Sequence, residues 1–184
     1  FRSGEKCAGL YTVTRGRVAL SVSVAGGPSK VIDLIGPGGH AGLAAAVLGA
    51  NHTTAAQALT ESTLLLTPHD ALIECAAAVS ELWPQIAADL SRQVCTLIAD
   101  VAAFSLNSGR ERVSRYLLDI GTTRGSRQQA VTLPAKKSII ASRLNLTPEY
   151  FSRMLHEMIA DGTIAVNGRN ITLLDPARLR VSPH

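Results

Sequence analysis

Three polar residues in the last third of the chain, Glu149, Ser152 and Arg153, have the types and spacing needed to bind nucleic-acid bases. They occur in the stretch TPEYFSRML at positions i, i+3 and i+4, which share one face of an α-helix. Arginine can donate two hydrogen bonds to guanine, glutamate can accept one from cytosine, and serine can bond to several base edges. The alternative is an exposed Glu–Arg pair that contributes about 0.2–0.5 kcal/mol. The helix is therefore a candidate for reading DNA sequence.

The same stretch has the local signals of a helix that begins sharply after a tight turn. Asn145 tolerates a left-handed backbone, Thr147 can cap the helix, and Pro148 suits its first position. An apolar stripe for packing occupies positions i, i+3, i+4 and i+7, namely Phe151, Met154, Leu155 and Met158. The three polar residues therefore face away from the stripe.

The elements around this helix predict a winged helix-turn-helix over residues 109–184. In chain order they are an amphipathic helix at 111–121 that ends at Gly121, a strand at 130–134, a short helix at 136–144, the helix at 147–162, and a hairpin at 163–174 with an Asn-Gly turn. In such a module the second helix of the pair enters the major groove and the hairpin contacts the backbone.

The first part of the chain predicts a small all-β module. Short segments rich in β-branched residues, separated by Gly, Pro and Ser turns, lie at 9–14, 17–24, 30–35 and 62–67, and a short helix is expected at 68–78. We therefore expect an α+β chain whose residues 1–82 form a small barrel or jelly roll. Because the first residue is Phe1 and strand signals start at once, an N-terminal part of this module is expected to be missing.

Residues 83–108 predict a long helix followed by a hinge at Asn107–Gly109. Its apolar positions alternate in steps of three and four, as in a heptad seam: Leu90, Val94, Leu97, Val101 and Phe104. Such a narrow seam favours pairing with a second copy of the chain, so we expect a homodimer. The alternative is that the seam packs only on its own β module.

The charge of the chain is divided between its two parts. Up to Ser108 there are six Lys and Arg against eight Asp and Glu, whereas from Gly109 onward there are twelve against six. A basic C-terminal part is expected if that module binds a polyanion such as double-stranded DNA, although a basic surface can also serve solubility alone.

The composition argues against several classes of protein. The chain is 46% hydrophobic over 184 residues, which suffices for a packed core, and contains no apolar run long enough to span a membrane. Cys7, Cys75 and Cys95 are an odd set without C-x-x-C spacing, which fits a reducing compartment, so we expect a cytoplasmic protein.

The sequence resembles the Crp/Fnr superfamily of bacterial transcription regulators. The resemblance rests on GLYTVTRGRVALSV, which is similar to the cyclic-nucleotide-binding-like barrel, on the heptad helix, and on ASRLNLTPEYFSRML. Glu149, Ser152 and Arg153 match the recognition-helix pattern of Fnr-like members, which implies TTGAT-type half-sites. Crp-like members have an additional arginine where this chain has Pro148, and they read TGTGA.

The resemblance also implies how the chain contacts DNA and other partners. Candidate phosphate contacts, which position the protein without reading sequence, are Thr147, Lys136, Lys137, Arg143 and Arg169. The loop at 122–129 lies where the family contacts RNA polymerase, although a surface loop without that role is an alternative. Effector binding would shift the two paired long helices relative to each other. The hinge at Asn107–Gly109 would transmit that shift to the two DNA-binding domains.

The effector expected from the resemblance is not cAMP. At the cAMP-binding positions this chain has Gly42-Leu43 and His52-Thr53, so the carboxylate for the ribose and the cation for the phosphate are missing. The cysteine spacing also gives no support to an iron–sulfur cluster. Similarity to Dnr-type regulators favours haem and nitric oxide sensing, with His40 or His52 as candidate haem ligand and Cys75 as a weaker candidate. Gly42, His52 and Thr53 are the candidate effector-pocket residues.

Two other functions compete with a ligand-controlled regulator. One is a constitutive DNA-binding dimer with a non-sensing barrel. The other is a cupin-like metal enzyme, which would need an H-x-H cluster that His40 lacks; no P-loop, Gly-x-Ser-x-Gly or H-E-x-x-H motif occurs in the sequence, so we do not expect an enzyme.

Overall fold

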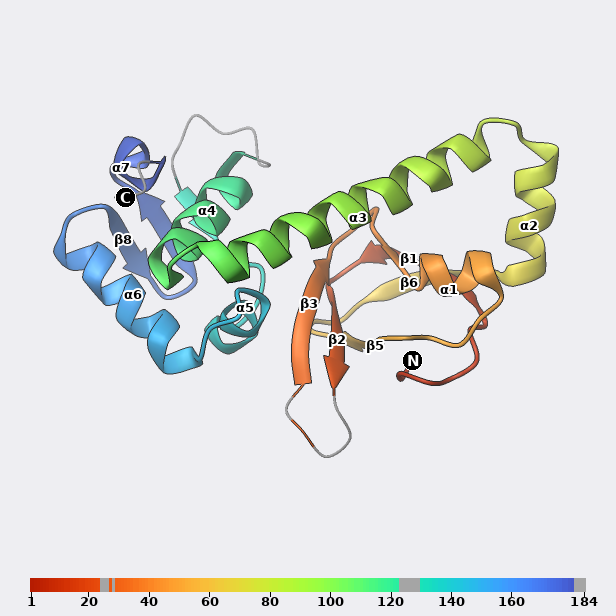
Figure 1. Cartoon of the computed structure of the whole chain (residues 1–184), viewed down its shortest axis with the longest axis horizontal. Coiled ribbons are helices and arrows are strands. Elements are labelled where there is room, and N and C mark those ends of the chain that lie inside the picture. Colours follow the sequence, from red (N-terminus) through yellow and green to blue (C-terminus); the bar gives the residue numbers. More distant parts are fainter. Residues whose placement is uncertain (24–26, 28, 123–129, 181–184) are drawn as a thin grey trace. The chain divides into compact units, whose positions relative to one another are not determined.

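The structure is a computed structural model that describes residues 1–23, 27, 29–122 and 130–180 (Figure 1). The chain forms two compact units, Phe1–Ile98 and Ala99–His184. The division falls inside the long helix α3 (Leu82–Leu106), so this helix contributes to both units. Each unit is described by itself below.

The N-terminal unit contains two antiparallel three-stranded sheets, with strand orders β4-β1-β6 and β3-β2-β5. Its strands are β1 (Gly9–Arg15), β2 (Val18–Ser23), β3 (Ser29–Ile35), β4 (His40–Ala41), β5 (Ala55–Ala58) and β6 (Thr63–Pro68). The four strands predicted from β-branched patterning are confirmed as β1, β2, β3 and β6. Strands β4 and β5 were not predicted.

Three helices of this unit share one apolar cluster with strand β1. They are α1 (Leu43–Leu48), α2 (His69–Ala78) and the first turns of α3, and the buried members of the cluster are Leu10, Leu43, Ala46, Leu72, Ala76 and Ile86. Each large aliphatic side chain buried there stabilises the unit by about 1.5–3 kcal/mol. Helix α2 confirms the helix expected at 68–78, whereas α1 was not predicted.

The C-terminal unit is a winged helix-turn-helix, as predicted. After the last turns of α3 it contains α4 (Gly109–Thr122), β7 (Ala130–Thr132), α5 (Lys137–Arg143), α6 (Pro148–Ala160), β8 (Ile164–Asn167), β9 (Asn170–Leu173) and α7 (Pro176–Arg180). The sheet order is β7-β9-β8 with antiparallel pairing. Helix α4 continues through Gly121 to Thr122, one residue beyond the predicted end, and α7 was not predicted.

The wing hairpin differs from the prediction in its register. Asn167 pairs with Asn170, so the two loop residues are Gly168 and Arg169 rather than Asn167 and Gly168. Gly168 has φ +61°, which glycine adopts without the penalty of a side chain. A positive φ at the first loop position is the pattern of a type II′ turn.

Within the described residues, no helix combines the length and hydropathy needed to cross a membrane. The same residues contain no group of three or more His, Cys, Asp or Glu placed to hold a metal ion.

Candidate nucleic-acid interface

The turn between α5 and α6 has the backbone geometry that its residues predicted. Asn145 has φ +57°, the one positive φ among the described residues other than glycine. The Leu146 amide donates to the Ala141 carbonyl at 2.9 Å, which closes the turn onto α5. The Thr147 hydroxyl accepts the Tyr150 amide at 3.2 Å and so caps α6, with Pro148 at the first helical position. These local bonds fix the angle at which α6 leaves the turn.

The two faces of α6 are also as predicted. Its apolar stripe is buried and consists of Phe151, Met154, Leu155 and Met158. Glu149 and Arg153 are exposed, and Ser152 is half-buried beside them. The structure therefore presents the three candidate base-reading side chains on the side of α6 that does not pack on the domain.

Arg153 has two neighbours along its own helix. Its guanidinium carbon lies 4.7 Å from the centroid of the Tyr150 ring, a cation–π distance, and its Nε lies 3.9 Å from Glu157 Oε1. The sequence allowed an exposed i,i+4 ion pair between Glu149 and Arg153 as the alternative to base reading. In the structure Arg153 instead lies near Glu157, four residues further along the helix. A pair this exposed contributes at most about 1 kcal/mol, so it does not prevent Arg153 from binding a base.

Arg143 does not have the free position expected of a phosphate contact. Its Nη1 lies 2.8 Å from Asp100 Oδ2, and the side chain is only 14% exposed. In this structure the guanidinium therefore ties α5 to the last turns of α3. The phosphate contact predicted for Arg143 would require this ion pair to open.

The other candidate phosphate contacts are placed at the surface. Lys136 and Lys137 are exposed at the start of α5. Arg169 is exposed in the wing loop, and its Nε and Nη2 both donate to the Leu133 carbonyl, at 3.1 and 2.7 Å. Thr147 uses its oxygen as an acceptor in the cap, which leaves its hydroxyl proton available to a phosphate.

The far end of α6 is held by a charged cluster around Asp161. The Arg110 guanidinium and the Thr163 hydroxyl donate to its carboxylate, and Arg178 donates to its carbonyl at 3.0 Å. Burial raises the pKa of Asp161, but the hydrogen bonds from Thr163 and Arg110 outweigh burial and hold the pKa below its ordinary value. This cluster joins α4, α6 and α7.

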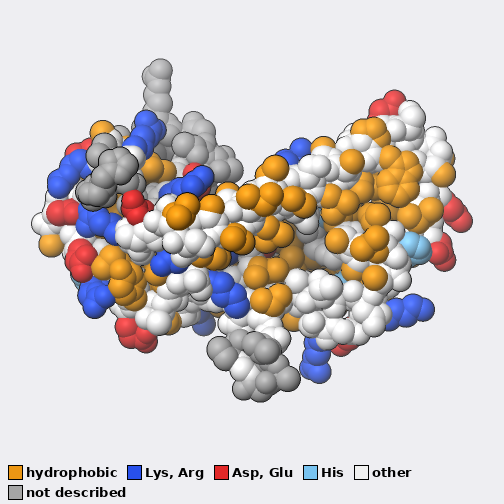
Figure 2. Space-filling model, in the orientation of Figure 1, with side chains coloured by type: hydrophobic (Ala, Val, Ile, Leu, Met, Phe, Trp, Pro, Cys, Tyr) orange, Lys and Arg blue, Asp and Glu red, His pale blue; other side chains and the backbone are white. Residues whose placement is uncertain are grey.

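Only part of the predicted heptad seam of α3 is exposed to solvent. Leu90 packs on the core of the N-terminal unit, and Phe104 is half-buried with the Arg112 guanidinium 5.8 Å from its ring centroid. The remaining seam residues are exposed, as is Ile98, which the heptad pattern did not include. The exposed apolar face of α3, visible in Figure 2, consists of Val94, Leu97, Ile98 and Val101.

The candidate effector residues Gly42 and His52 lie in contact, but the histidine is not open to a ligand. The His52 side chain is buried (3% exposed) and its ring stacks on Phe1 with centroids 3.6 Å apart. A β-carbon on Gly42 would lie 2.9 Å from His52 Cε1. Burial lowers the pKa of His52, and its Nε2 has no hydrogen-bond partner among the described residues. Thr53 is exposed, and its carbonyl accepts the Ser3 hydroxyl.

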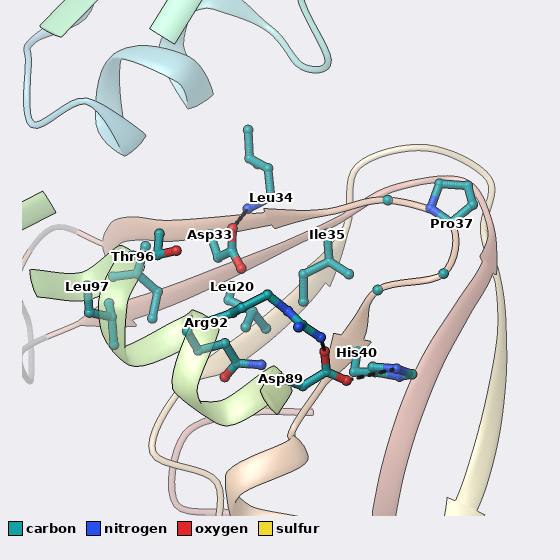
Figure 3. A pocket seen from close by; sticks show the side chains of 15 residues that line it. Leu20, Asp33, Leu34, Ile35, Pro37, His40, Asp89, Arg92, Thr96 and Leu97 are labelled. Atoms are coloured by element: carbon teal, nitrogen blue, oxygen red, sulfur yellow. Dashed lines mark hydrogen bonds and ion pairs between the residues drawn. The ribbon is translucent and has the colours of Figure 1, made fainter. Parts of the chain in front are cut away.

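His40 lines a pocket of about 500 Å³ between β3, the turn at 36–39 and α3 (Figure 3). Apolar walls are supplied by Leu20, Ile35 and Leu97. His40 Nδ1 lies 3.1 Å from the Thr12 hydroxyl, and Nε2 lies 3.9 Å from Asp89 Oδ2. Of the two candidate haem ligands, His40 therefore lines a pocket, whereas the ring of His52 is buried.

The winged helix-turn-helix and the exposed polar face of α6 indicate a DNA-binding regulator, and comparisons with known proteins agree. Residues 1–78 match the cyclic nucleotide-binding domain model, and residues 111–181 match the Crp-like helix-turn-helix domain model. The chain belongs to the Crp/Fnr family of transcription regulators.

Relatives and solved structures match along nearly the whole chain. The fumarate and nitrate reduction regulatory protein of Vibrio cholerae is 25% identical over 97% of this chain and 72% of the relative. The nitrogen fixation regulation protein FixK of Azorhizobium caulinodans is 28% identical over 98% of this chain and 73% of its own length. The structure of FixK2 from Bradyrhizobium japonicum has a TM-score of 0.83 at 24% identity and covers 97% of this chain and 92% of that chain.

Proposed function

We propose that this chain is a sequence-specific transcription regulator that binds palindromic DNA as a homodimer through TTGAT-type half-sites. The observation that carries the proposal is the outward face of α6, where Glu149, Ser152 and Arg153 stand on a capped and packed helix. A carboxylate facing phosphates would weaken binding, so Glu149 beside Arg153 favours contact with base edges. Pro148 cannot donate from its side chain, which favours TTGAT over the TGTGA read with an additional arginine.

The dimer is proposed to form through the exposed apolar face of α3. Val94, Leu97, Ile98 and Val101 lie at positions i, i+3, i+4 and i+7 and are solvent-exposed in the single chain. Pairing two such faces removes them from water at about 25 cal/mol per Å² of apolar surface. A two-fold dimer would place two α6 helices on half-sites about one DNA turn apart.

We propose that the effector pocket is the one lined by His40, rather than the region of Gly42, His52 and Thr53. Its volume lies within the range of about 300–1,000 Å³ that is typical of ligand pockets. Haem with His40 Nε2 as ligand, and a response to nitric oxide, is the chemistry we favour, because the sequence resembles the Dnr-type regulators and His40 lines this pocket. The Leu43 side chain is buried and supplies no carboxylate for the ribose of cAMP.

We further propose that the regulator acts in the cytoplasm and contacts RNA polymerase. The loop at 122–129 remains the proposed contact, and its residues 123–129 lie outside the described residues. The purified chain should show no catalytic turnover in this role.

Selection of bound duplexes from a random pool tests the proposed DNA specificity without assuming a site. We expect enrichment of a palindrome with TTGAT-type half-sites whose centres are about one helical turn apart. Enrichment of TGTGA half-sites would contradict the role given to Pro148, and recovery of no motif would contradict base reading altogether.

Haem titration tests the effector proposal. We expect a Soret band on haem addition that is lost in His40→Ala, is retained in His52→Ala, and shifts with nitric oxide. An unchanged spectrum together with unchanged DNA affinity would instead favour the constitutive DNA-binding dimer. In that case His40 would serve only its contacts with Thr12 and Asp89.

A further inference from the structure

The Tyr150 side chain lies between the start of α4 and the guanidinium of Arg153. Tyr150 belongs to the first turn of α6, and its ring is half-buried. One side of the ring is occupied by Arg153, at 4.7 Å from the centroid. The ring also lies against Gly109, where an added β-carbon would be 2.2 Å from Tyr150 Cε1 and 2.9 Å from Cζ. The ring therefore contacts both the α4 backbone and the candidate base-reading arginine.

Because Gly109 has no side chain, the Tyr150 ring can pack closely against the start of α4. A β-carbon does not come within 3.0 Å of a heavy atom of a non-neighbouring residue, so any side chain at position 109 must displace the Tyr150 ring. Gly109 is buried and is the first residue of α4, separated from the end of α3 by Asn107 and Ser108. The ring of Tyr150 is thus packed on the junction between these two helices.

Arg153 benefits from this packing because its side chain is otherwise free to adopt many rotamers. The side chain is 63% exposed, and its ion pair with Glu157 is long at 3.9 Å. An aromatic face that is itself held in place favours one position of the guanidinium before DNA binds. Preorganising a contact in this way reduces the ordering that binding must otherwise accomplish.

We propose that Tyr150 is a positioning residue for base recognition, which orients Arg153 and transmits displacements of the α3–α4 junction to it. This inference rests on the proposed function, because it takes Arg153 to contact a base. Because the ring packs on Gly109, a displacement of this backbone toward the ring would move the ring, and with it the aromatic face on which the Arg153 guanidinium lies. In this way the Tyr150 side chain would couple the position of helix α3 to base recognition by Arg153.

The test measures half-site selectivity in the full chain, as the ratio of affinities for a TTGAT-type palindrome and for one in which the guanine is replaced. Tyr150→Leu removes the ring, and Tyr150→Phe keeps it as the matched control. An exposed cation–π contact corresponds to roughly a two- to fivefold change in equilibrium constant. We expect Tyr150→Leu to lower the ratio by about that factor, Tyr150→Phe to keep it, and Gly109→Ala to lower it like Tyr150→Leu.

Two further measurements separate positioning from a general structural role. In the background Arg153→Ala, changing Tyr150 to Leu should cause no further decrease of the ratio, because the ring would have nothing left to position. In the DNA-free wild-type chain, the side-chain protons of Arg153 should show an upfield ring-current shift by nuclear magnetic resonance. This second readout does not depend on whether any variant folds.

Each outcome decides between the inference and the proposal on which it rests. If Arg153→Ala lowers the ratio and Tyr150→Leu leaves it unchanged, or if the ring-current shift is absent, Tyr150 is not a positioning residue and the proposed function stands. An equal decrease from Tyr150→Leu with and without Arg153 also rules out positioning through Arg153. If Arg153→Ala itself keeps the wild-type ratio, base reading by Arg153 is wrong and the inference falls with it.

Discussion

The guanidinium of Arg143 and the carboxylate of Asp100 form an ion pair of 2.8 Å that joins the first helix of the helix-turn-helix to the end of α3. Both side chains are largely shielded, with exposures of 14% and 23%. A partly buried pair such as this one is more sensitive to removal of one partner than a surface pair is. It therefore makes the position of α5 dependent on α3.

Asp100→Asn is predicted to destabilise the C-terminal unit by about 1–3 kcal/mol, between the values for exposed and fully buried pairs. The reason is that the Arg143 charge stays shielded but no longer has its counter-charge. Hydrogen exchange of the α5 amides in the full chain measures the effect. The control is Asp89→Asn, whose partner Arg92 has a 70% exposed side chain and which should not affect α5 exchange. Equal α5 protection in wild type and Asp100→Asn would show that the pair is not stabilising.

Thr147→Ala is predicted to weaken the start of α6 by about 1 kcal/mol, because it removes the oxygen that caps the Tyr150 amide. Thr147→Ser keeps a hydroxyl at the same place and should retain most of the stability. Urea unfolding followed by resonances of the C-terminal unit distinguishes the two variants. Identical midpoints for Thr147→Ala and Thr147→Ser would mean that the cap contributes nothing.

The stability of the N-terminal unit is predicted to fall as the pH decreases through about 6.5. Burial lowers the pKa of His52, so in this range the unfolded chain binds a proton that the folded chain does not. Stability is then complete above the ordinary histidine pKa and decreases as the pH moves down toward the folded value. Fluorescence of Trp83, the single tryptophan, reports urea unfolding of this unit.

The pH dependence should be flatter in His52→Gln than in wild type, whereas His156→Gln, which changes an exposed residue of α6, should leave the slope unaltered. The slopes are compared rather than the absolute stabilities, because His52→Gln also removes the stacking on Phe1. If the unfolding free energy of His52→Gln depends on pH as steeply as that of wild type, groups other than His52 cause the pH dependence.

Val101→Asp is predicted to convert the proposed dimer into a monomer, because it would bury a charge in the paired apolar faces of α3. Ala99→Asp introduces the same charge two residues away, on the opposite side of the helix, and should remain dimeric. Light scattering gives the mass of each variant. A dimeric Val101→Asp variant would place the interface elsewhere.

The recognition unit could be predicted from sequence because its signals are local. The left-handed turn at Asn145, the cap at Thr147 and the apolar period of α6 each involve residues within a few positions of one another. The ion pair of Arg143 could not be predicted in this way, because Asp100 lies far away in sequence and the helix pattern alone leaves Arg143 on a surface.

The elements missed in the barrel lack strong local preference. Strand β5 has the sequence Ala-Ala-Gln-Ala, without a β-branched or aromatic residue, and is extended because it pairs with β2. Helix α1 is a single Ala-rich segment of six residues between glycines at 42 and 49. Isolated helices of that length are not stable, so packing of Leu43 and Ala46 on the core decides its conformation. The wing turn shifted by one residue for a similar reason, since strand pairing sets its register.

The central claim, that α6 reads bases, is tested most directly by the affinity ratio of Arg153→Ala for a TTGAT-type palindrome and for a scrambled duplex. We predict that discrimination falls by about 1–3 kcal/mol relative to wild type. Lys136→Ala serves as the control and should weaken both duplexes alike, while the slope of log affinity against log salt concentration decreases in magnitude by about one. A wild-type ratio in Arg153→Ala would contradict the claim.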